Sequence, residues 1–394
     1  MIKKRIFLII LSLVFSAFIS SQLRIEIKGG LEDPINIAIV PFQWNLKTPQ
    51  QESIQKVVQS DLESFGEYAV LSPENMLSLP SKAEEVFFKD WRILGSDFLV
   101  IGEVNPLEEP TEMLVNYLIF DVVRERIIHR GKVIGPIVTQ RKMAHKISDK
   151  IYSKTQGIPG IFSTKIAYID KPSDLNPAYN LMISDIDGFD SLSLFSSPQP
   201  LMSPSWSSDM KKIAYVSFEE GSSRIYIQEL ATAERIGLKQ EEGINSSPNW
   251  SPDGKKMSAV LSKSGNPDIH IYDFKQSRWI QLTNHFGIDT EPDWSPDSNK
   301  LIFTSNRSGS PQIYELNVKS KKVKRLTFEG SYNARARYLP NGKEIVFVHR
   351  RNGIFHIATQ NIKTGKIKIL TDTTLDESPT VSPNGNVVIY RTSD

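Results

Sequence analysis

The sequence contains no cysteine, and this absence excludes several kinds of chemistry at once. A chain without cysteine forms no disulfide bond, has no thiol nucleophile and offers no cysteine ligand to a metal. Histidine is scarce, with six residues in 394, and the HExxH spacing of a zinc protease does not occur. A GxSxG nucleophile elbow is absent as well. No motif therefore indicates catalysis or a cofactor, and we expect neither.

The sequence also lacks an imbalance of charge. Its 47 basic and 45 acidic residues leave a net charge of +2, and no block of five like charges occurs. Proteins that bind nucleic acid through a charged surface usually carry a strong positive field or a basic tail. We therefore do not expect nucleic acid as a partner.

The N-terminus has the three-part pattern of a secretory signal peptide. Basic residues at 3–5 precede an apolar run at 6–19, and two serines follow at 20–21. The apolar run is shorter than the ~20 residues needed to cross a bilayer. We predict that residues 1–21 are removed, leaving a soluble exported protein that begins at Gln22 and has no membrane span. The alternative is an uncleaved N-terminal anchor.

Residues 22–158 combine the patterns of strands and helices. The apolar run "INIAIVPF" (35–42) predicts a buried strand. Segment 48–66 predicts a helix with Thr48 as N-cap and Pro49 at the first helical position. Further strands are predicted at 68–72, 97–104 and 112–123, and a second helix at 139–154. This alternation predicts a small α/β domain with helices packed on a sheet.

A repeat of about 44 residues occupies the chain from residue 159 onwards. Segment 249–257, "NWSPDGKKM", has four counterparts, and the aligned aromatic or equivalent positions are Trp206, Trp250, Trp294, Tyr338 and Val381. These positions are separated by 44, 44, 44 and 43 residues. The apolar segments 165–170 and 180–187 add an earlier, partial copy. Four short strands in every ~40–45 residues are typical of a propeller blade, so we predict an all-β six-bladed β-propeller over 159–394.

The repeated "SPDG" has the chemistry of a tight turn. Pro252 presets φ, Asp253 tolerates the bridge region, and Gly254 can adopt a positive φ. Met210 and Ser298 stand where other copies have glycine, so we expect mild strain there. The preceding tryptophan is expected to pack between neighbouring blades.

Two other functions are open to these repeated residues. Asp253 and Asp297 could ligate a metal, and the tryptophans could stack on sugars or bases. However, the turn needs aspartate for local hydrogen bonds, and a propeller needs large side chains between its blades. We therefore favour the structural roles and predict no metal site.

Beyond the repeat, the chain resembles the TolB family, the periplasmic components of the Tol–Pal system. The resemblance is carried, in order and spacing, by "IVPFQW" (39–44), "SPQPLMSPSWS" (197–207), "EPDWSPDS" (291–298), "LTFEGS" (326–331) and "LDESPTVSPNGNVVIY" (375–390). It covers the whole chain. The bare repeat is less specific, because propellers of several peptidases and lyases carry it too.

The resemblance implies a protein of the periplasm that is not an enzyme. Such a protein binds the lipoprotein Pal at one mouth of its propeller and communicates with TolA through its mature N-terminal segment. It helps the outer membrane to constrict at division and to stay intact. Other outer-membrane proteins are further candidate partners, and a monomer is expected. The alternative function is that of a propeller domain in a periplasmic polysaccharide lyase or peptidase-like enzyme.

The resemblance places the Pal site where loops enter the innermost strands, just before each aromatic position. The candidate residues are Met202, Ser203, Asn245, Ser246, Ser247, Asp289, Thr290, Glu291, Asn333, Arg335, Asp376 and Glu377. They come from different blades but converge around one axis, which suits a protruding loop of a partner. The alternative is that they are ordinary polar loop residues.

The TolA site is expected in the first residues of the mature chain. Its candidate residues are Gln22, Leu23, Arg24, Ile25, Glu26 and Ile27, in which apolar and polar side chains alternate. With the following Gly29 and Gly30, they form a mobile N-terminal strand, residues 22–30, that can add to the sheet edge of a partner. The alternative is an ordinary edge strand of its own domain.

The resemblance also implies a departure at the C-terminus. Members of the family continue past the position of Asp394, with a segment that would supply the innermost strand of the first blade and close the ring. Here the chain stops inside the sixth repeat. We expect a truncated last blade, with the ring-closing strand missing because the sequence is a fragment; the alternative is a natural end with a different closure.

Overall fold

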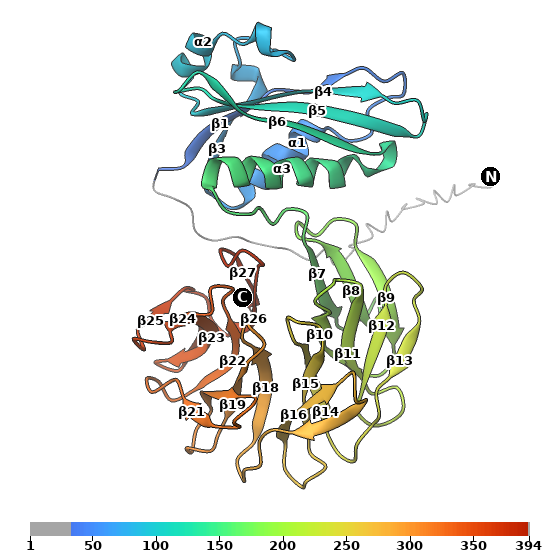
Figure 1. Ribbon diagram of the computed structural model, residues 1–394, viewed down its shortest axis with the longest axis vertical. Coiled ribbons are helices and arrows are strands. Elements are labelled where there is room, and N and C mark those ends of the chain that lie inside the picture. The colour runs from blue at the N-terminus through green and yellow to red at the C-terminus, as the bar shows by residue number, and fades with distance from the viewer. Residues whose placement is uncertain (1–32, 393–394) are drawn as a thin grey trace, which may run out of the picture.

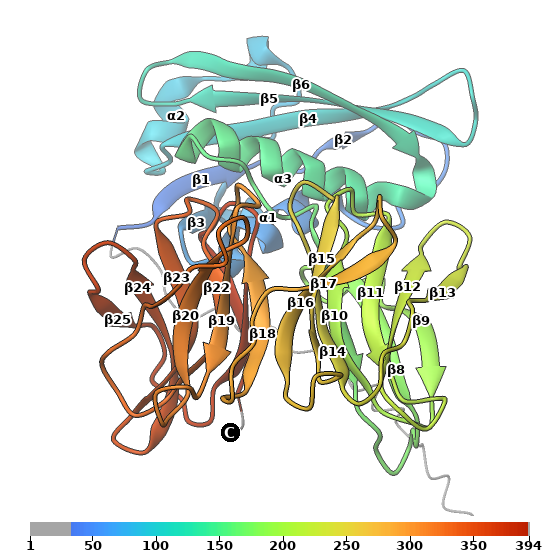
Figure 2. The ribbon, with the colours of Figure 1, turned by 60° about the horizontal axis from the view of Figure 1, so that its bottom comes forward.

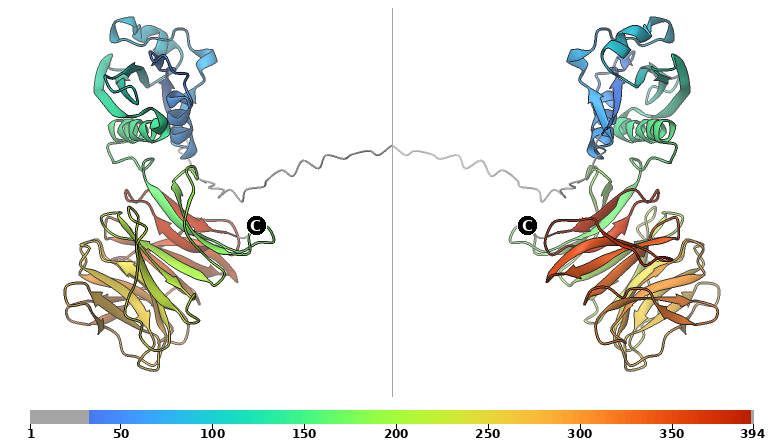
Figure 3. Two further views of the ribbon diagram at one scale, coloured as in Figure 1. Left: turned by 90° about the vertical axis from the view of Figure 1, so that its right-hand side faces the viewer. Right: turned by 90° about the vertical axis from the view of Figure 1, so that its left-hand side faces the viewer.

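The computed structural model describes residues 33–392, which form two parts (Figure 1). An α/β domain stands at one end, and a ring of β-sheets lies below it in the two side views (Figure 3). The predicted signal peptide and the N-terminal segment 22–30 lie outside the described residues. Among the helices of residues 33–392, none has the length and apolar character needed to cross a membrane.

The α/β domain contains one mixed sheet. Its strands are β1 (Ile35–Ile39), β2 (Gln43–Trp44), β3 (Tyr68–Leu71), β4 (Phe98–Pro106), β5 (Glu112–Asp121) and β6 (Arg126–Pro136). They lie in the order β3-β1-β4-β5-β6, with β2 paired to β4. The helices are α1 (Ile54–Ser64), α2 (Phe88–Ile93) and α3 (Gln140–Gln156), with short 3-10 turns at Pro73–Asn75, Ala83–Glu85 and Ile137–Thr139.

Both faces of this sheet are covered, which explains the continuous apolar run predicted as a strand. Ile37 and Ile39 of β1 point to the face packed by α1 and α3, where Ile54 and Ile147 join the same core. The alternate residues Ala38 and Val40 point to the other face, where Trp91 of α2 packs. The predicted strands and the two predicted helices are present, and β2, β6 and α2 are additional elements.

The boundary prediction is right for α3 and wrong for α1. Helix α3 ends at Gly157, which adopts φ +79° and is a left-handed C-cap. Helix α1 begins at Ile54, six residues after the predicted cap, because the hydroxyl of Ser53 accepts a hydrogen bond from the Lys56 amide at 3.3 Å. The carbonyl of Thr48 instead accepts from the indole of Trp44 at 2.7 Å, in a bend before the helix.

The second part is a β-propeller built from antiparallel sheets around a common axis (Figure 2). Its complete four-stranded sheets are β10–β13 (Leu201–Trp206, Lys212–Ser217, Arg224–Glu229, Arg235–Gly237), β14–β17 (Asn245–Trp250, Lys256–Leu261, Asp268–Asp273, Arg278–Gln281), β18–β21 (Asp289–Trp294, Lys300–Ser305, Gln312–Asn317, Val323–Arg325) and β22–β25 (Asn333–Tyr338, Glu344–Arg351, Ile354–Asn361, Ile367–Ile369). In each of them the first strand is the innermost.

Two smaller sheets lie at the ends of the propeller sequence. A three-stranded sheet contains β7 (Lys165–Asp170), β8 (Tyr179–Asp185) and β9 (Leu192–Ser197), and a two-stranded sheet contains β26 (Glu377–Val381) and β27 (Val388–Arg391). Counting sheets of three or more strands, the described residues form five blades rather than the predicted six. The difference arises because the last repeat contributes only two strands.

The repeated motif forms the predicted turn. In the four copies that have the serine, it bonds locally to the aspartate or asparagine: Ser251 donates to Asp253 at 2.6 Å, and the Lys255 amide donates to the same carboxylate at 3.0 Å. Gly254 has φ +69°, and both Met210 and Ser298 adopt φ +59° at its position. The prediction of strain at these two residues is thus confirmed, because non-glycine side chains rarely adopt this conformation.

The tryptophans pack between sheets, as predicted. Trp294 is 4% exposed and joins one core with Ile271 of the preceding sheet and Leu301 of its own. Its indole N–H donates to the carbonyl of Asn249 in the preceding sheet at 3.0 Å. Trp250 stacks on Phe274 with ring centroids 4.8 Å apart. These contacts support the architectural role of the repeat.

Candidate functional site

The innermost strands begin at the end of the propeller that points away from the α/β domain. The turn between β26 and β27 touches that domain, since the Asn386 amide donates to the Tyr152 hydroxyl of α3 at 3.5 Å and Val387 packs against the core of the domain. The starts of β10, β14, β18, β22 and β26 lie at the opposite end of these strands, which is the lower end of the propeller in Figure 2. We call this end the mouth of the propeller; it carries the candidate Pal-site residues.

Each innermost strand carries a β-bulge at the mouth. The register of pairing between the innermost strand and its neighbour shifts just after Met202, Ser246, Thr290, Ala334 and Glu377. The residue at the bulge is left-handed each time, with φ between 50° and 55°, at Ser203, Ser247, Glu291, Arg335 and Ser378. A left-handed non-glycine residue costs about 1–2 kcal/mol, and bulges redirect side chains near functional sites. Because this costly conformation recurs in five strands, we infer that it serves to orient these side chains at the mouth.

A chain of polar contacts crosses three innermost strands at the mouth. The guanidinium of Arg335 on β22 donates to Glu291 of β18 at 2.9 Å and to the hydroxyl of Ser378 of β26 at 2.6 Å. Glu377 lies 3.4 Å from the same guanidinium. Thr304 donates to Glu291 at 2.9 Å and accepts from the Arg335 amide at 3.0 Å. The bulges thus bring three of the predicted residues together.

Four of the predicted residues are turned away from solvent. Asn245, Asp289, Asn333 and Asp376 occupy equivalent positions, and each is 2% exposed or less. Asn333 donates to the carbonyl of Glu329 at 2.8 Å, and Asp289 pairs with Arg307 at 2.6 Å. Asn245, Asn333 and Asp376 thus anchor the loops that enter their innermost strands. A partner at the mouth would meet the remaining predicted residues, of which Met202, Ser203 and Glu377 are exposed and Ser246, Ser247, Thr290, Glu291 and Arg335 are half-buried.

The sequence analysis missed a set of exposed apolar side chains on the same loops. Phe286 is 86% exposed, Phe328 is 73% exposed and Leu375 is 54% exposed. They precede β18, β22 and β26, so they rim the mouth together with Met202. Exposed apolar groups that gather at one place mark binding surfaces. Their signal in the sequence was a large apolar residue inside an otherwise polar loop.

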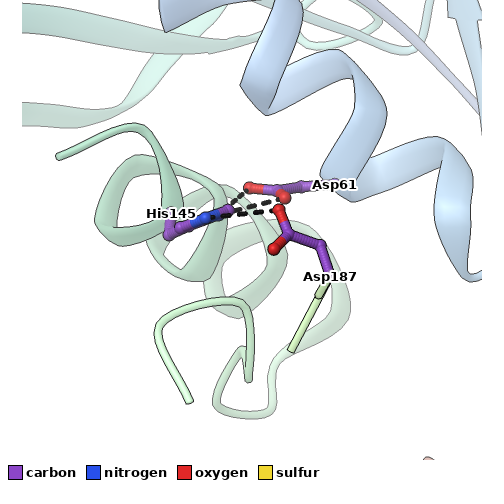
Figure 4. A group of neighbouring side chains, drawn as sticks. All are labelled: Asp61, His145 and Asp187. Carbon is purple, nitrogen blue, oxygen red and sulfur yellow. Dashed lines mark hydrogen bonds and ion pairs between the residues drawn. The ribbon is translucent and has the colours of Figure 1, made fainter. Parts of the chain in front are cut away.

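A second cluster lies between the two parts of the molecule, far from the mouth. It consists of Asp61 on α1, His145 on α3 and Asp187 in the loop that follows β8 (Figure 4). Their ligand atoms all lie within 4.8 Å of one another, which is a spacing that a metal site requires. None of the sequence patterns pointed to this cluster.

The surroundings of this cluster argue against a metal ion. Asp61 already accepts hydrogen bonds from His145 Nδ1 at 2.9 Å and from Ser148 at 2.6 Å. Asp187 forms an ion pair with Arg141. Burial raises the pKa of the Asp61 carboxyl, although His145 and Ser148 oppose this shift. Protein cations and donors therefore balance the two carboxylates, as in a buried ion-pair network.

Both parts of the chain match known families. Residues 152–394 match the TolB beta propeller domain, and residues 23–128 match the TolB amino-terminal domain. The propeller match alone spans more than half of the chain.

Curated relatives and a solved structure agree with these matches. The Tol-Pal system protein TolB of Pseudomonas syringae pv. syringae is 39% identical over 233 residues, which are 58% of this chain and 53% of that protein. The Tol-Pal system protein TolB of Marinomonas sp. is 42% identical over 247 residues, 62% of this chain and 57% of that protein. The chain thus spans about half the length of the curated relatives it matches. The crystal structure of TolB from Acinetobacter baumannii is similar, with a TM-score of 0.85, 38% identity, and coverage of 94% of this chain and 90% of that one.

Proposed function

The chain belongs to the TolB family, and from this membership we propose that it is a non-enzymatic, periplasmic, protein-binding component of the Tol–Pal system. The signal-peptide pattern supports the periplasm as its location. The proposed role is to maintain the outer membrane and to support its constriction during division. We also propose that the two smaller sheets, β7–β9 and β26–β27, are the incomplete blades of a six-bladed ring, and that the domains divide near residue 158.

We propose that Pal binds at the mouth. The observation that carries this proposal is the joint presence of a polar centre and an apolar rim at one end of the propeller. The centre is the chain from Glu291 through Arg335 to Ser378, and the rim includes Phe286 and Phe328. Protein interfaces commonly bury aromatic anchors beside an arginine, so this composition suits a protein partner.

The test is to remove the two aromatic anchors together. Phe286→Ala with Phe328→Ala should weaken binding of purified Pal by about tenfold or more, because truncating an anchor typically costs about 2 kcal/mol. Isothermal titration calorimetry measures the affinity. Both side chains are largely exposed, so the variant should keep its thermal stability. Ile236→Ala, which removes an exposed apolar side chain from the outer strand β13, is the matched control and should bind as the unchanged chain does.

The polar centre allows an independent test of the same site. Thr290→Arg combined with Glu291→Lys places two positive charges beside Arg335 and removes its carboxylate partner. Affinity for Pal should fall by at least tenfold, as like charges at an interface core are costly (about 1.4 kcal/mol per factor of ten). Full affinity in this variant and in the double phenylalanine variant would place the Pal site elsewhere.

We further propose that residues 22–27 bind TolA as an added strand. These residues lie outside the described part of the chain, so the proposal depends on their alternating pattern and on the family. Deleting residues 22–28 should weaken TolA binding or change its coupling to Pal. Unchanged affinities for both partners would refute this proposal and leave the Pal site untouched.

A further inference from the structure

One charged cluster joins the α/β domain to the first sheet of the propeller. Arg141 on α3 forms ion pairs with Glu52, which precedes α1, and with Asp187 in the loop between β8 and β9. The ring of Phe189, from the same loop, lies 3.5 Å from the guanidinium carbon. The side chain of Arg141 is only 13% exposed. The loop of the propeller is therefore fastened to α3 by a largely desolvated ion pair and a cation–π contact.

His145 lies one helical turn from Arg141 and faces both domains. Its Nδ1 is 2.9 Å from Asp61 of its own domain, and its Nε2 is 3.5 Å from Asp187 of the propeller (Figure 4). The residue is 1% exposed, and Nε2 has no hydrogen-bond partner. A neutral imidazole that donates from Nδ1 to Asp61 leaves Nε2 as an acceptor facing a carboxylate, which is repulsive. A protonated imidazole donates to both sides.

The charges around His145 favour its protonated form. The groups that face it are Asp61 from α1, Asp187 from the β8–β9 loop and Arg141 from α3, with Glu52 behind Arg141. Three carboxylates and one guanidinium give the cluster a charge of −2 when His145 is neutral and −1 when it is protonated. Lys142 and Asp190 add a balanced pair at the edge, 3.5 Å apart.

We propose that His145 is a pH-sensitive latch between the two domains. When protonated, it bridges Asp61 and Asp187 and holds the β8–β9 loop on α3. When it loses its proton, the facing carboxylates repel each other and the loop contact weakens, so that the propeller can move relative to the α/β domain. Histidine suits this role because it changes charge near neutral pH. The latch does not depend on which proteins bind at the mouth or at the N-terminus.

The energetics agree in sign with this geometry. Burial disfavours the charged imidazole, but the hydrogen bond and charge of Asp61, together with the charge of Asp187, outweigh it and raise the pKa of His145 above 6.5. The closed arrangement is therefore favoured at low pH and lost as the pH rises through that raised value. Each pKa unit that the interface contributes corresponds to about a tenfold change in the ratio of closed to open molecules.

The absence of cysteine makes the test direct. Val123→Cys on the α/β domain and Ile236→Cys on the propeller are both exposed sites for spin labels. Pulsed electron–electron double resonance measures the distance between the two labels. It should give one narrow distance distribution at pH 5.5 and a broader or shifted one at pH 8.5. His145→Gln, which is neutral at every pH, should give the broad distribution at both. His129→Gln, on strand β6, is the matched control and should keep the transition.

Several outcomes would overturn the latch. They are a distribution that does not change between pH 5.5 and 8.5, or a His145→Gln variant that keeps the transition. Because a buried substitution can disturb folding, Asp187→Asn on the propeller loop provides a second variant, which should also lose the transition. If zinc added at neutral pH narrows the distribution and a chelator reverses it, the cluster is a metal site and the latch is wrong.

Discussion

Arg335 lies at the centre of the polar contacts at the mouth of the propeller. It holds a left-handed conformation at φ +55° and contacts Glu291 and Ser378 on the two neighbouring innermost strands. Its side chain is 39% exposed, so it remains accessible to a partner while its neighbours orient it. Because the side chain of this arginine is already held in place, it loses little conformational entropy when its N–H groups bind a partner.

Replacing Arg335 should therefore affect binding more than folding. We expect Arg335→Ala to weaken Pal binding by about 10- to 100-fold, as for arginine hot spots elsewhere. The loss of partly exposed ion pairs should cost about 1 kcal/mol of stability or less. Lys368→Ala, which removes an exposed lysine from the outer strand β25, should change neither quantity. Titration calorimetry and thermal unfolding measure the two effects, and a variant with full affinity would contradict the role of Arg335.

Met210 has a strained backbone conformation in its turn, at a position where most other copies of the repeat have glycine. Its φ of +59° is close to the +69° of Gly254. Met210→Gly should stabilise the chain by about 1 kcal/mol, since an L side chain pays about 1–2 kcal/mol in this region. The reverse change, Gly254→Ala, should destabilise it, because the new methyl would lie 2.7 Å from the Ser208 hydroxyl. Chemical denaturation measures the change in the free energy of unfolding, which should be positive for Met210→Gly and negative for Gly254→Ala. Changes of the same sign in both variants would contradict the strain at this position.

The loops that enter the innermost strands depend on one buried polar residue each. Asn245, Asp289, Asn333 and Asp376 occupy this position. Asn245, Asn333 and Asp376 form hydrogen bonds to the loop that precedes the strand, and Asp289 pairs with Arg307. The exposed rim of the mouth is part of these same loops. The buried residues therefore position the surface to which a partner would bind.

Asn333 provides a test of this positioning role. Its amide donates to Gln312 and to the carbonyl of Glu329, and its oxygen lies 2.7 Å from His349. Asn333→Ala removes these contacts, including the hydrogen-bond partner of the buried His349 Nδ1, and should cost about 1–3 kcal/mol. Hydrogen exchange should show the loss of protection at residues 326–333 first. The exposed Asn284 serves as control, and uniform exchange in the Asn333 variant would argue against a local role.

At the scale of the whole molecule, stability should depend on pH through His145. Its folded pKa lies above 6.5, so its stabilising contribution is complete below pH 6.5 and is lost as the pH rises through the folded value. Burial lowers the pKa of His129, His270 and His349, so these residues change stability only below pH 6.5. Of these four histidines, only His145 therefore changes stability above pH 6.5.

Urea unfolding between pH 6.5 and 8.5 measures this dependence. The free energy of unfolding should fall with rising pH in the unchanged chain and should fall less in His145→Gln. The variant should also be less stable at pH 6.5, where the charged bridge to Asp61 and Asp187 is present. Parallel curves for the two proteins would show that His145 contributes nothing to the pH dependence.

Features that repeat along the chain, or that depend only on neighbouring residues, could be predicted from the amino-acid sequence. The 44-residue period, the turn at Pro252 to Gly254 and the cap of α3 at Gly157 all follow from local conformational preferences. The packing of Trp294 between sheets followed from its fixed place in each repeat. The start of α1 escaped prediction because two capping residues, Thr48 and Ser53, compete within six positions.

Only the tertiary structure decided which residues face solvent and which meet across the chain. At the mouth, Asn333 is buried, whereas Arg335, two residues later on the bulged strand β22, is partly exposed. At the domain contact, His145 meets Asp61 from 84 residues away and Asp187 from the propeller. Pairings of this kind depend on how sheets and helices pack, and no local preference encodes them. The architecture could thus be predicted from the repeat, whereas the contacts of both clusters required the fold.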